Sequence, residues 1–299
     1  MDSLVMWKHL SKIKSRITSH QLTNLNPLSA LYRYIFWQFY YRFIRKYRIV
    51  NWVKPLKIKL QKGAHAVNAQ YYLGLADFPE MAFTMHFLRE HDLFIDIGAY
   101  QGMYSLLAAG IGKSNVLAFE PDEQSFHSLQ YQFILNKLDK NIDYRQIALG
   151  DKNAKGSLTE HKSQQNHIET DSQTEPNISI HRLDDEVAKL NNPCLLKLDA
   201  EGYELNILKG AANILANTLL KAIIIEMMEL GSRYGSSDIQ VHNVLLQHGF
   251  GMYQYDAFKR ELIVQSQLTT GNMIYIRDLD FVKQRLVSAK VFTVLGKEI

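Results

Sequence analysis

The stretch that decides the fold is residues 93–102, LFIDIGAYQG, in which an apolar segment runs into a glycine-containing loop. Leu93 to Ile97 predicts a buried strand, and the apolar residues after the loop predict a helix. Gly98 and Gly102 leave the loop backbone bare, so a ligand can lie against it and the helix can start close to the sheet. Asp96, at the carboxyl end of the strand, offers that ligand a negative charge. This order predicts a cofactor-binding loop.

A second apolar segment, Asn115 to Phe119, predicts the neighbouring parallel strand. It ends in Glu120, Pro121 and Asp122, which places a carboxylate where a ribose diol is commonly bound. A nicotinamide site typically has three glycines spaced G-x-G-x-x-G, whereas this loop has two glycines preceded by an acid. S-adenosylmethionine suits the loop better, because its ammonium group can face an aspartate and it has no pyrophosphate that needs a helix N-terminus.

Length and composition predict a single cytoplasmic enzyme with an extension. The chain has 299 residues, of which 46% are apolar, enough for one large core. Its one cysteine, Cys194, excludes an intramolecular disulfide and favours a reducing compartment. The N-terminus does not have the pattern of a signal peptide, and no segment has the roughly 18 uncharged apolar residues of a membrane-spanning helix.

Charge is distributed unevenly along the chain. Residues 1–76 contain 13 Lys or Arg and one acid, whereas residues 77–299 contain 21 basic and 29 acidic residues. Within the basic part, residues 30–53 include ten aromatic and five basic side chains. We therefore expect an N-terminal basic, aromatic, helical extension over residues 1–68 and a catalytic domain over residues 69–299.

Three interpretations of the extension remain open. It can form a helix that packs on the catalytic domain or on a partner in a homodimer, with its basic residues favoured by the helix dipole. Residues 30–62 can instead bind the anionic inner face of a membrane, although the basic residues scatter around the projected helix. A nucleic-acid arm is the third interpretation and is not expected, because no recognised nucleic-acid module accompanies it.

Beyond residue 77, strand and helix patterns alternate, which predicts a parallel sheet covered on both faces. We expect helices over residues 123–138 and 203–217, and a polar, mobile loop over residues 160–177. The further strands are expected at residues 142–149, ending beside an adenine pocket, and at residues 194–198, 221–228, 252–256 and 273–277.

Acidic residues follow or interrupt two of these strands. Asp199 and Glu201 come directly after the strand that begins at Cys194, and Glu226 interrupts a very apolar strand, where a carboxylate is expensive unless it is paired or functional. Asp199 could instead cap the next helix, and Glu201 could pair with Lys197. Since H-E-x-x-H and C-x-x-C patterns are absent, no dedicated transition-metal site is expected, although carboxylates alone could hold magnesium.

Five segments in order, DIGAYQGMYSLLAA, AFEPD, ALGD, LLKLDAEGYELNILKGA and IIIEMME, resemble the FkbM-type S-adenosylmethionine-dependent methyltransferases. The similarity covers about residues 70–278, and Lys197 to Ala211 is its most specific part. Tyr100 departs from the family, which usually has Asn there. The resemblance implies a class I, Rossmann-like, doubly wound sheet of seven strands, the last antiparallel, with residues 72–83 as a roof over the cofactor.

The resemblance also implies roles for individual residues. Asp96, Gly98 and Gly102 would hold the methionine part of S-adenosylmethionine, Glu120 the ribose, and Asp122 and Ala148 the adenine. Asp199 and Glu201 would face the methyl group. The expected cofactor-binding set is completed by Ala99, Tyr104, Pro121 and Asp199, and the expected catalytic set is Asp199, Glu201 and Glu226.

The resemblance implies O-methylation of a hydroxyl, and we expect that hydroxyl on a sugar of a glycolipid, surface polysaccharide or secondary metabolite. A sugar hydroxyl is a poor nucleophile while protonated, so a general base beside the methyl group would accelerate transfer by about 10²- to 10⁴-fold. Alternatives are methylation of a small non-sugar hydroxyl or an amine, or a non-catalytic module that binds S-adenosylmethionine and attaches to a membrane or partner. A nicotinamide-dependent dehydrogenase is a further alternative function.

Overall fold

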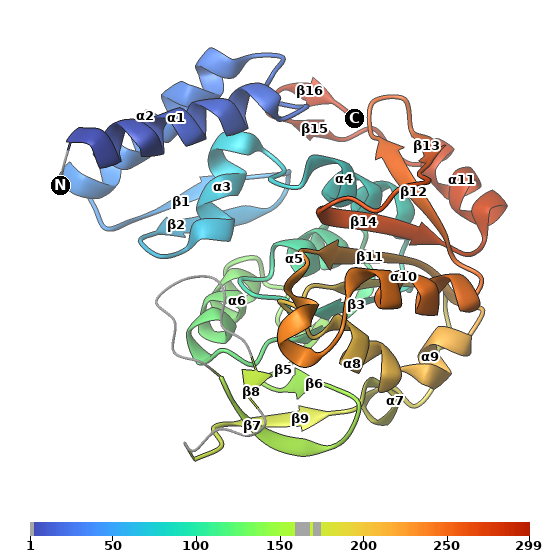
Figure 1. The fold of residues 1–299 in the computed structure, drawn as a ribbon. Helices are drawn as coiled ribbons and strands as arrows, with labels where there is room; N and C mark the ends of the chain where they lie inside the picture. Colours follow the sequence, from blue (N-terminus) through green and yellow to red (C-terminus); the bar gives the residue numbers. More distant parts are fainter. Residues whose placement is uncertain (1–2, 159–167, 170–174) are drawn as a thin grey trace.

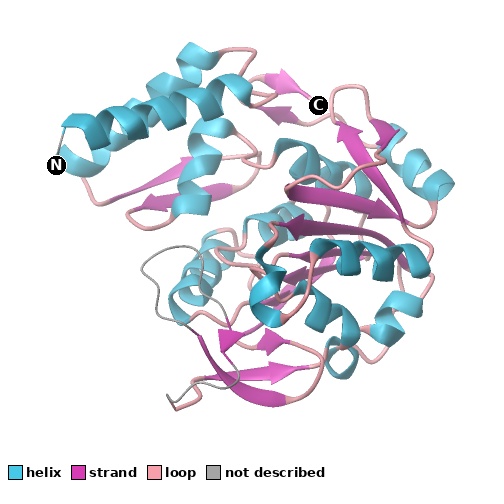
Figure 2. Ribbon diagram, in the orientation of Figure 1, coloured by secondary structure: helices cyan, strands magenta, loops and turns pink. Residues whose placement is uncertain are grey.

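The computed structural model describes residues 3–158, 168–169 and 175–299. Its central feature is an eight-stranded sheet in the order β13-β12-β14-β11-β10-β3-β4-β5 (Figures 1 and 2). The strands are β3 (Leu93–Ile97), β4 (Asn115–Phe119), β5 (Ile142–Arg145), β10 (Cys194–Leu198), β11 (Leu220–Met227), β12 (Gly251–Asp256), β13 (Glu261–Val264) and β14 (Gly271–Ile276). Five of them, from β11 to β5, run parallel, and β14 is antiparallel to both β11 and β12.

This order confirms the doubly wound, Rossmann-like α/β fold. The seven predicted strands are joined by an eighth, β13, which pairs with β12 as an antiparallel hairpin at the sheet edge. Helices cover both faces, as expected for a largely parallel sheet whose strands are buried on both sides. One face carries α4 (Phe78–Phe87), α5 (Met103–Gly110), α6 (Glu123–Leu135) and α11 (Leu279–Val287), and the other carries α8 (Glu204–Lys209), α9 (Ala212–Ala216) and α10 (Asp238–Gln247).

Two sequence expectations need correction. The strand expected over residues 142–149 ends at Arg145, and Ala148–Leu149 forms a separate strand, β6, in a small sheet with β7 (Ala154–Leu158), β8 (Ile168–Glu169) and β9 (Ile178–His181). The helix expected over residues 203–217 is divided at Gly210, where a Cβ would lie 1.9 Å from the Gly150 carbonyl oxygen. That approach of two backbones interrupts the helix. Most of the loop expected over residues 160–177 lies outside the described residues.

The short elements complete the fold of the catalytic region. They are α7 (Leu183–Glu186), the 3₁₀ helix η1 (Leu230–Tyr234), and a C-terminal hairpin of β15 (Thr293–Val294) and β16 (Lys297–Glu298). Among the described residues, no helix combines the length and apolar character needed to cross a bilayer.

The N-terminal region forms a lobe beside the sheet, drawn in blue in Figure 1. It contains α1 (Ser3–Ser19), α2 (Pro27–Phe43), the hairpin of β1 (Tyr47–Asn51) and β2 (Lys57–Gln61), and α3 (His65–Leu73). The helical expectation therefore holds for α1 and α2, but residues 47–51 are a strand. The lobe packs on the catalytic region, because Leu22, Trp37 and Ile58 share one apolar core with residues of α4 and α5.

Candidate active site

A cleft of about 1100 Å³ opens at the carboxyl ends of β3, β4, β10 and β11. This is where ligands bind in open α/β sheets. Residues from α2, α3 and the turn after β2 line its other side. The expected cofactor-binding and catalytic residues, from Asp96 in β3 to Glu226 in β11, all lie along this cleft except Gly102.

The alternation of side chains along a strand explains why three charged side chains lie on the same face of the sheet. In β3, β10 and β11, Phe94, Leu195 and Ile224 join the core on the α4 and α5 side. Successive side chains of a strand point to opposite faces, so residues two positions further on share that side. These residues are Asp96, Lys197 and Glu226, and Lys197 is the direct register partner of Asp96.

Asp96 is held by the helix that follows the loop. Its Oδ2 accepts hydrogen bonds from Ser105 N at 3.2 Å and Ser105 Oγ at 2.6 Å. Burial raises the pKa of Asp96, against the opposing effects of Lys197 and Ser105. Within the described part of the chain, Asp96 Oδ1 is buried without a hydrogen-bond partner. A buried carboxylate oxygen left in this state is suited to a cationic ligand group.

The loop between β3 and α5 has a conformation that its glycines make available. Gly98 has a φ of 71°, and a Cβ there would lie 1.8 Å from the Asp199 carbonyl oxygen. The backbone of the loop between β3 and α5 therefore touches the backbone of the loop after β10. A Cβ on Gly102 would lie 3.1 Å from Leu129 and Phe133, so this glycine lets α5 start close to α6. Tyr100 has a φ of 50°, a region that Asn enters more readily, which gives a backbone reason for the family's preference.

Glu120 fixes this loop from the end of the next strand. Its Oε2 accepts from Tyr100 N at 2.7 Å and its Oε1 accepts from Asp122 N at 2.9 Å. Burial raises the pKa of Glu120 to about 8, although both backbone N–H groups favour the charged form. Asp122 caps α6 by accepting from Ser125 N at 2.8 Å. Both acids, together with Pro121 and the buried Ala148, face the cleft.

Asp199 forms an ion pair with the lysine two residues before it. Lys197 Nζ donates to Asp199 Oδ2 at 2.9 Å, and the lysine side chain is only 5% exposed. Lys197 therefore pairs with Asp199, whereas the alternative interpretation from the sequence paired it with Glu201. Since α8 begins only at Glu204, the helix-cap interpretation of Asp199 is wrong. Burial opposes ionisation, but Lys197 and a hydrogen bond with Glu226 hold the pKa of Asp199 below its usual value.

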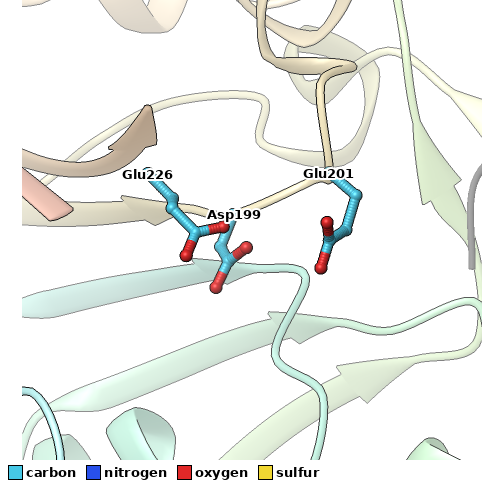
Figure 3. Close-up of side chains that lie close together, drawn as sticks. All are labelled: Asp199, Glu201 and Glu226. Carbon is cyan, nitrogen blue, oxygen red and sulfur yellow. The ribbon is translucent and has the colours of Figure 1, made fainter. Parts of the chain in front are cut away.

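Glu226 and Glu201 lie on either side of Asp199, as Figure 3 shows. Burial and then the Asp199 charge raise the pKa of Glu226 to about 9, so near neutral pH it is a protonated partner of Asp199. Burial and the same charge raise the pKa of Glu201 to about 7. One oxygen of each carboxyl group lies within 4.8 Å of the others, a spacing that a metal ion can also bridge. Two of the three already have partners, in Lys197 and the Asp199–Glu226 hydrogen bond.

Several contacts in the cleft were not predicted from the sequence, although Asp77 lies within residues 72–83, the segment expected to roof the cofactor. Asp77, just before α4, accepts a 3.3 Å hydrogen bond from Tyr104 Oη, and Lys197 lies 5.0 Å from the Tyr104 ring centroid. Across the cleft, Trp37 and Tyr41 of α2 reach the same space. The aromatic composition of residues 30–53 was the only signal for that wall, and it did not indicate which side chains turn inward.

Comparison with known families identifies the chain. Residues 96–252 match the model described as the methyltransferase FkbM domain, which is more than half of the 299-residue chain. The chain belongs to this family. It is an S-adenosylmethionine-dependent methyltransferase, as its glycine loop and carboxylates predicted. No curated protein matches the FkbM methyltransferase sequence significantly.

Three solved structures are similar to this chain at low identity. An rRNA methylase from Streptococcus thermophilus is 16% identical, with 66% of this chain and 91% of that chain covered and a TM-score of 0.38. Precorrin-6y C5,15-methyltransferase from Geobacter metallireducens is 11% identical, with 68% and 88% covered and a TM-score of 0.38. TrmK from M. capricolum, in complex with S-adenosylhomocysteine, is 10% identical, with 67% and 68% covered and a TM-score of 0.37. Matches at this level say nothing about the acceptor of the FkbM methyltransferase.

The cleft of the FkbM methyltransferase fits the cofactor. Asp96 Oδ1, buried and without a hydrogen-bond partner among the described residues, suits the ammonium group of the methionine part, and Glu120 stands at the end of β4 beside the expected ribose. Its volume of about 1100 Å³ exceeds the roughly 300–1000 Å³ of a typical small-molecule site, which leaves space for an acceptor next to the cofactor.

Proposed function

We propose that this enzyme methylates a hydroxyl group, and that the hydroxyl belongs to a sugar of a glycolipid, surface polysaccharide or secondary metabolite. The observation that carries the proposal is Glu201, a half-buried carboxyl in the cleft with a pKa of about 7. A general base works best when its pKa is near the working pH. An amine acceptor is nucleophilic once neutral and needs no such group during transfer, whereas a hydroxyl must lose its proton.

The three carboxyl groups then divide the work. S-adenosylmethionine supplies an electrophilic methyl group on sulfur. Glu201 accepts the hydroxyl proton as the oxygen bonds to that carbon and the carbon–sulfur bond breaks, leaving a neutral thioether. Asp199, kept ionised by Lys197, is too weak a base for this step but can accept a hydrogen bond that orients the acceptor. Protonated Glu226 donates a hydrogen bond to the Asp199 carboxylate and so fixes the orientation of Asp199.

The wall opposite the carboxylates supports a sugar as the acceptor. It is formed by the N-terminal lobe and combines aromatic rings with side-chain amides: Tyr34, Trp37, Gln38, Tyr41 and Gln61. Amides both donate and accept hydrogen bonds, and tyrosine and tryptophan present an apolar body with a polar tip. Such a surface suits a ring that has hydroxyls at its rim and carbon–hydrogen bonds on its faces.

The test is methyl transfer from labelled S-adenosylmethionine to paired acceptors. One member of each pair is a simple glycoside with a free hydroxyl, and the other is its deoxy counterpart; amines of similar size form a third arm. We expect transfer only to free hydroxyls, and a loss of about 10²- to 10⁴-fold in kcat for Glu201→Gln with unchanged cofactor affinity by calorimetry. Transfer to amines, with no sugar methylated, would contradict the proposal. Cofactor binding without turnover in every arm would favour the non-catalytic module.

A further inference from the structure

Helix α2 has two apolar faces that point in opposite directions. Its inner face buries Ala30, Tyr34 and Trp37 against the rest of the lobe and the cleft. Its outer face, which we call the outer stripe, is solvent-exposed and consists of Leu28 (78% exposed), Tyr32 (68%), Ile35 (52%), Phe39 (52%) and Phe43 (72%). Packing on the catalytic region therefore uses only half of the apolar surface of this helix.

The outer stripe is a continuous surface because of its spacing. Its members follow one another at intervals of three or four residues, which places them on one side of an α-helix. Beside the stripe on α2, the Arg48 guanidinium lies 4.9 Å from the Phe36 ring centroid and 5.2 Å from that of Tyr40. Soluble monomers rarely leave a large apolar patch uncovered, so this one points to an interaction surface.

The positive charge around the outer stripe indicates which kind of partner can bind there. Arg42, Arg45, Lys46 and Arg48 lie at its C-terminal end, and residues 3–76 contain no acidic residue. A second copy of the chain, docked through the same face in a symmetric dimer, would bring the same cations together without a compensating acid. A lipid surface with anionic headgroups fits both the exposed apolar stripe and the cations at its end, because apolar rings enter the interface while Lys and Arg contact the headgroups.

We infer that the outer stripe of α2 docks the enzyme on an anionic membrane surface. The helix lies in the interface plane and does not cross the bilayer. Because the inner face of α2 contributes Trp37 and Gln38 to the cleft, docking places the cleft about one helix diameter, roughly 10–12 Å, from the lipid surface. The proposed sugar acceptor, on which this last step rests, could then remain attached to a lipid during methylation.

The experiment is cosedimentation of the full chain with vesicles of phosphatidylcholine alone or with about 30 mol% phosphatidylglycerol. One variant carries Ile35→Gln, Phe39→Gln and Phe43→Gln. Its matched control carries Ile239→Gln, Leu246→Gln and Val287→Gln, which alter exposed apolar residues of α10 and α11. A charge variant carries Arg45→Gln and Lys46→Gln. Thermal unfolding and calorimetric binding of S-adenosylmethionine verify that each protein is folded, and neither readout depends on an acceptor.

The wild type and the matched control should bind anionic vesicles, be released by salt, and bind neutral vesicles weakly. Affinity should fall about tenfold or more in the stripe variant. The charge variant should lose about thirtyfold, since each basic residue near an anionic surface contributes roughly a fivefold factor. Failure of the wild type to bind either vesicle, or equal binding by the stripe variant, would overturn the inference. A dimer in light scattering that the stripe variant abolishes would assign the surface to a second copy instead.

Discussion

Lys197 and Asp199 lie two residues apart on β10 and the loop after it, and their charged groups meet at 2.9 Å, with the lysine side chain 5% and the aspartate side chain 31% exposed. The lysine is needed because Asp199 also faces two further carboxyl groups, Glu201 and Glu226. One cation among these acids keeps Asp199 ionised while burial and repulsion keep a proton on Glu226. The Lys197–Asp199 pair thus determines which carboxyl groups of the active site are ionised and which are protonated.

Replacing Lys197 by methionine should lower the free energy of unfolding, because Asp199 would lose its cationic partner. Asp199, whose side chain is 31% exposed, would remain beside Glu201 and Glu226 without its cation, and we expect the protein to lose about 1–3 kcal/mol of stability. In the wild type the pKa of Asp199 is depressed, so its stabilising contribution is present above its unfolded pKa and is lost in acid. In the variant the pKa rises, so the deficit in unfolding free energy should grow with pH between about 5 and 8.

Urea denaturation at both pH values measures this deficit. The control is Lys221→Met, because Lys221, at the opposite end of β11 from Glu226, forms an ion pair of similar length, 2.8 Å, with the 41%-exposed Asp278. That change should cost about 1 kcal/mol or less at either pH. Equal losses in the two variants would mean that Lys197 contributes no more than a surface ion pair.

Glu226→Gln should make the enzyme more stable at alkaline pH. The pKa of Glu226 is raised to about 9, so the folded protein holds a proton that the unfolded chain releases above about 4.5. The wild type therefore loses this contribution as pH rises from about 4.5 to 9. Glutamine mimics the neutral acid, so the melting temperature of the variant should exceed that of the wild type increasingly with pH. The exposed Glu261→Gln is the control and should follow the wild type.

Comparing Gly98→Ala with a second glycine variant should separate the effect of steric contact on stability from the effect of backbone strain. In Gly98→Ala the new Cβ would lie 1.8 Å from the Asp199 carbonyl oxygen, at a φ of 71°. We expect a loss of about 3 kcal/mol or more and strongly weakened cofactor binding, because the two loops must separate. Gly235→Ala is the matched control, with a φ of 68° and open space around the new Cβ, and should cost about 1 kcal/mol. Similar melting temperatures for both variants would show that the loop contact is not tight.

How far the sequence predicted this site depends on the range of the interactions. Asp96, Asp199 and Glu226 could be placed together because strand alternation and parallel order bring strand ends to one edge. The contribution of Trp37 and Tyr41 could not be predicted, since these residues meet the cleft through packing of the N-terminal lobe, which is distant in sequence from Asp199 and Glu226. The division of the helix at Gly210 likewise depends on contact with Gly150, which no local pattern records.

Glu120 and Glu204 allow the cofactor loop and the catalytic loop to be tested by the same substitution. Each buried glutamate accepts two backbone N–H groups: Glu120 from Tyr100 and Asp122, and Glu204 from Ala200 at 3.0 Å and Gly202 at 3.1 Å. Alanine should destabilise the protein by about 1–3 kcal/mol in both cases, because buried donors lose their acceptor. Only Glu120→Ala should greatly weaken calorimetric binding of S-adenosylmethionine, since it also removes the expected ribose contact. Glu204→Ala should chiefly lower kcat, because the loop it shapes carries Glu201. If both variants bound the cofactor equally well, Glu120 would be a loop-fixing residue and not a ligand.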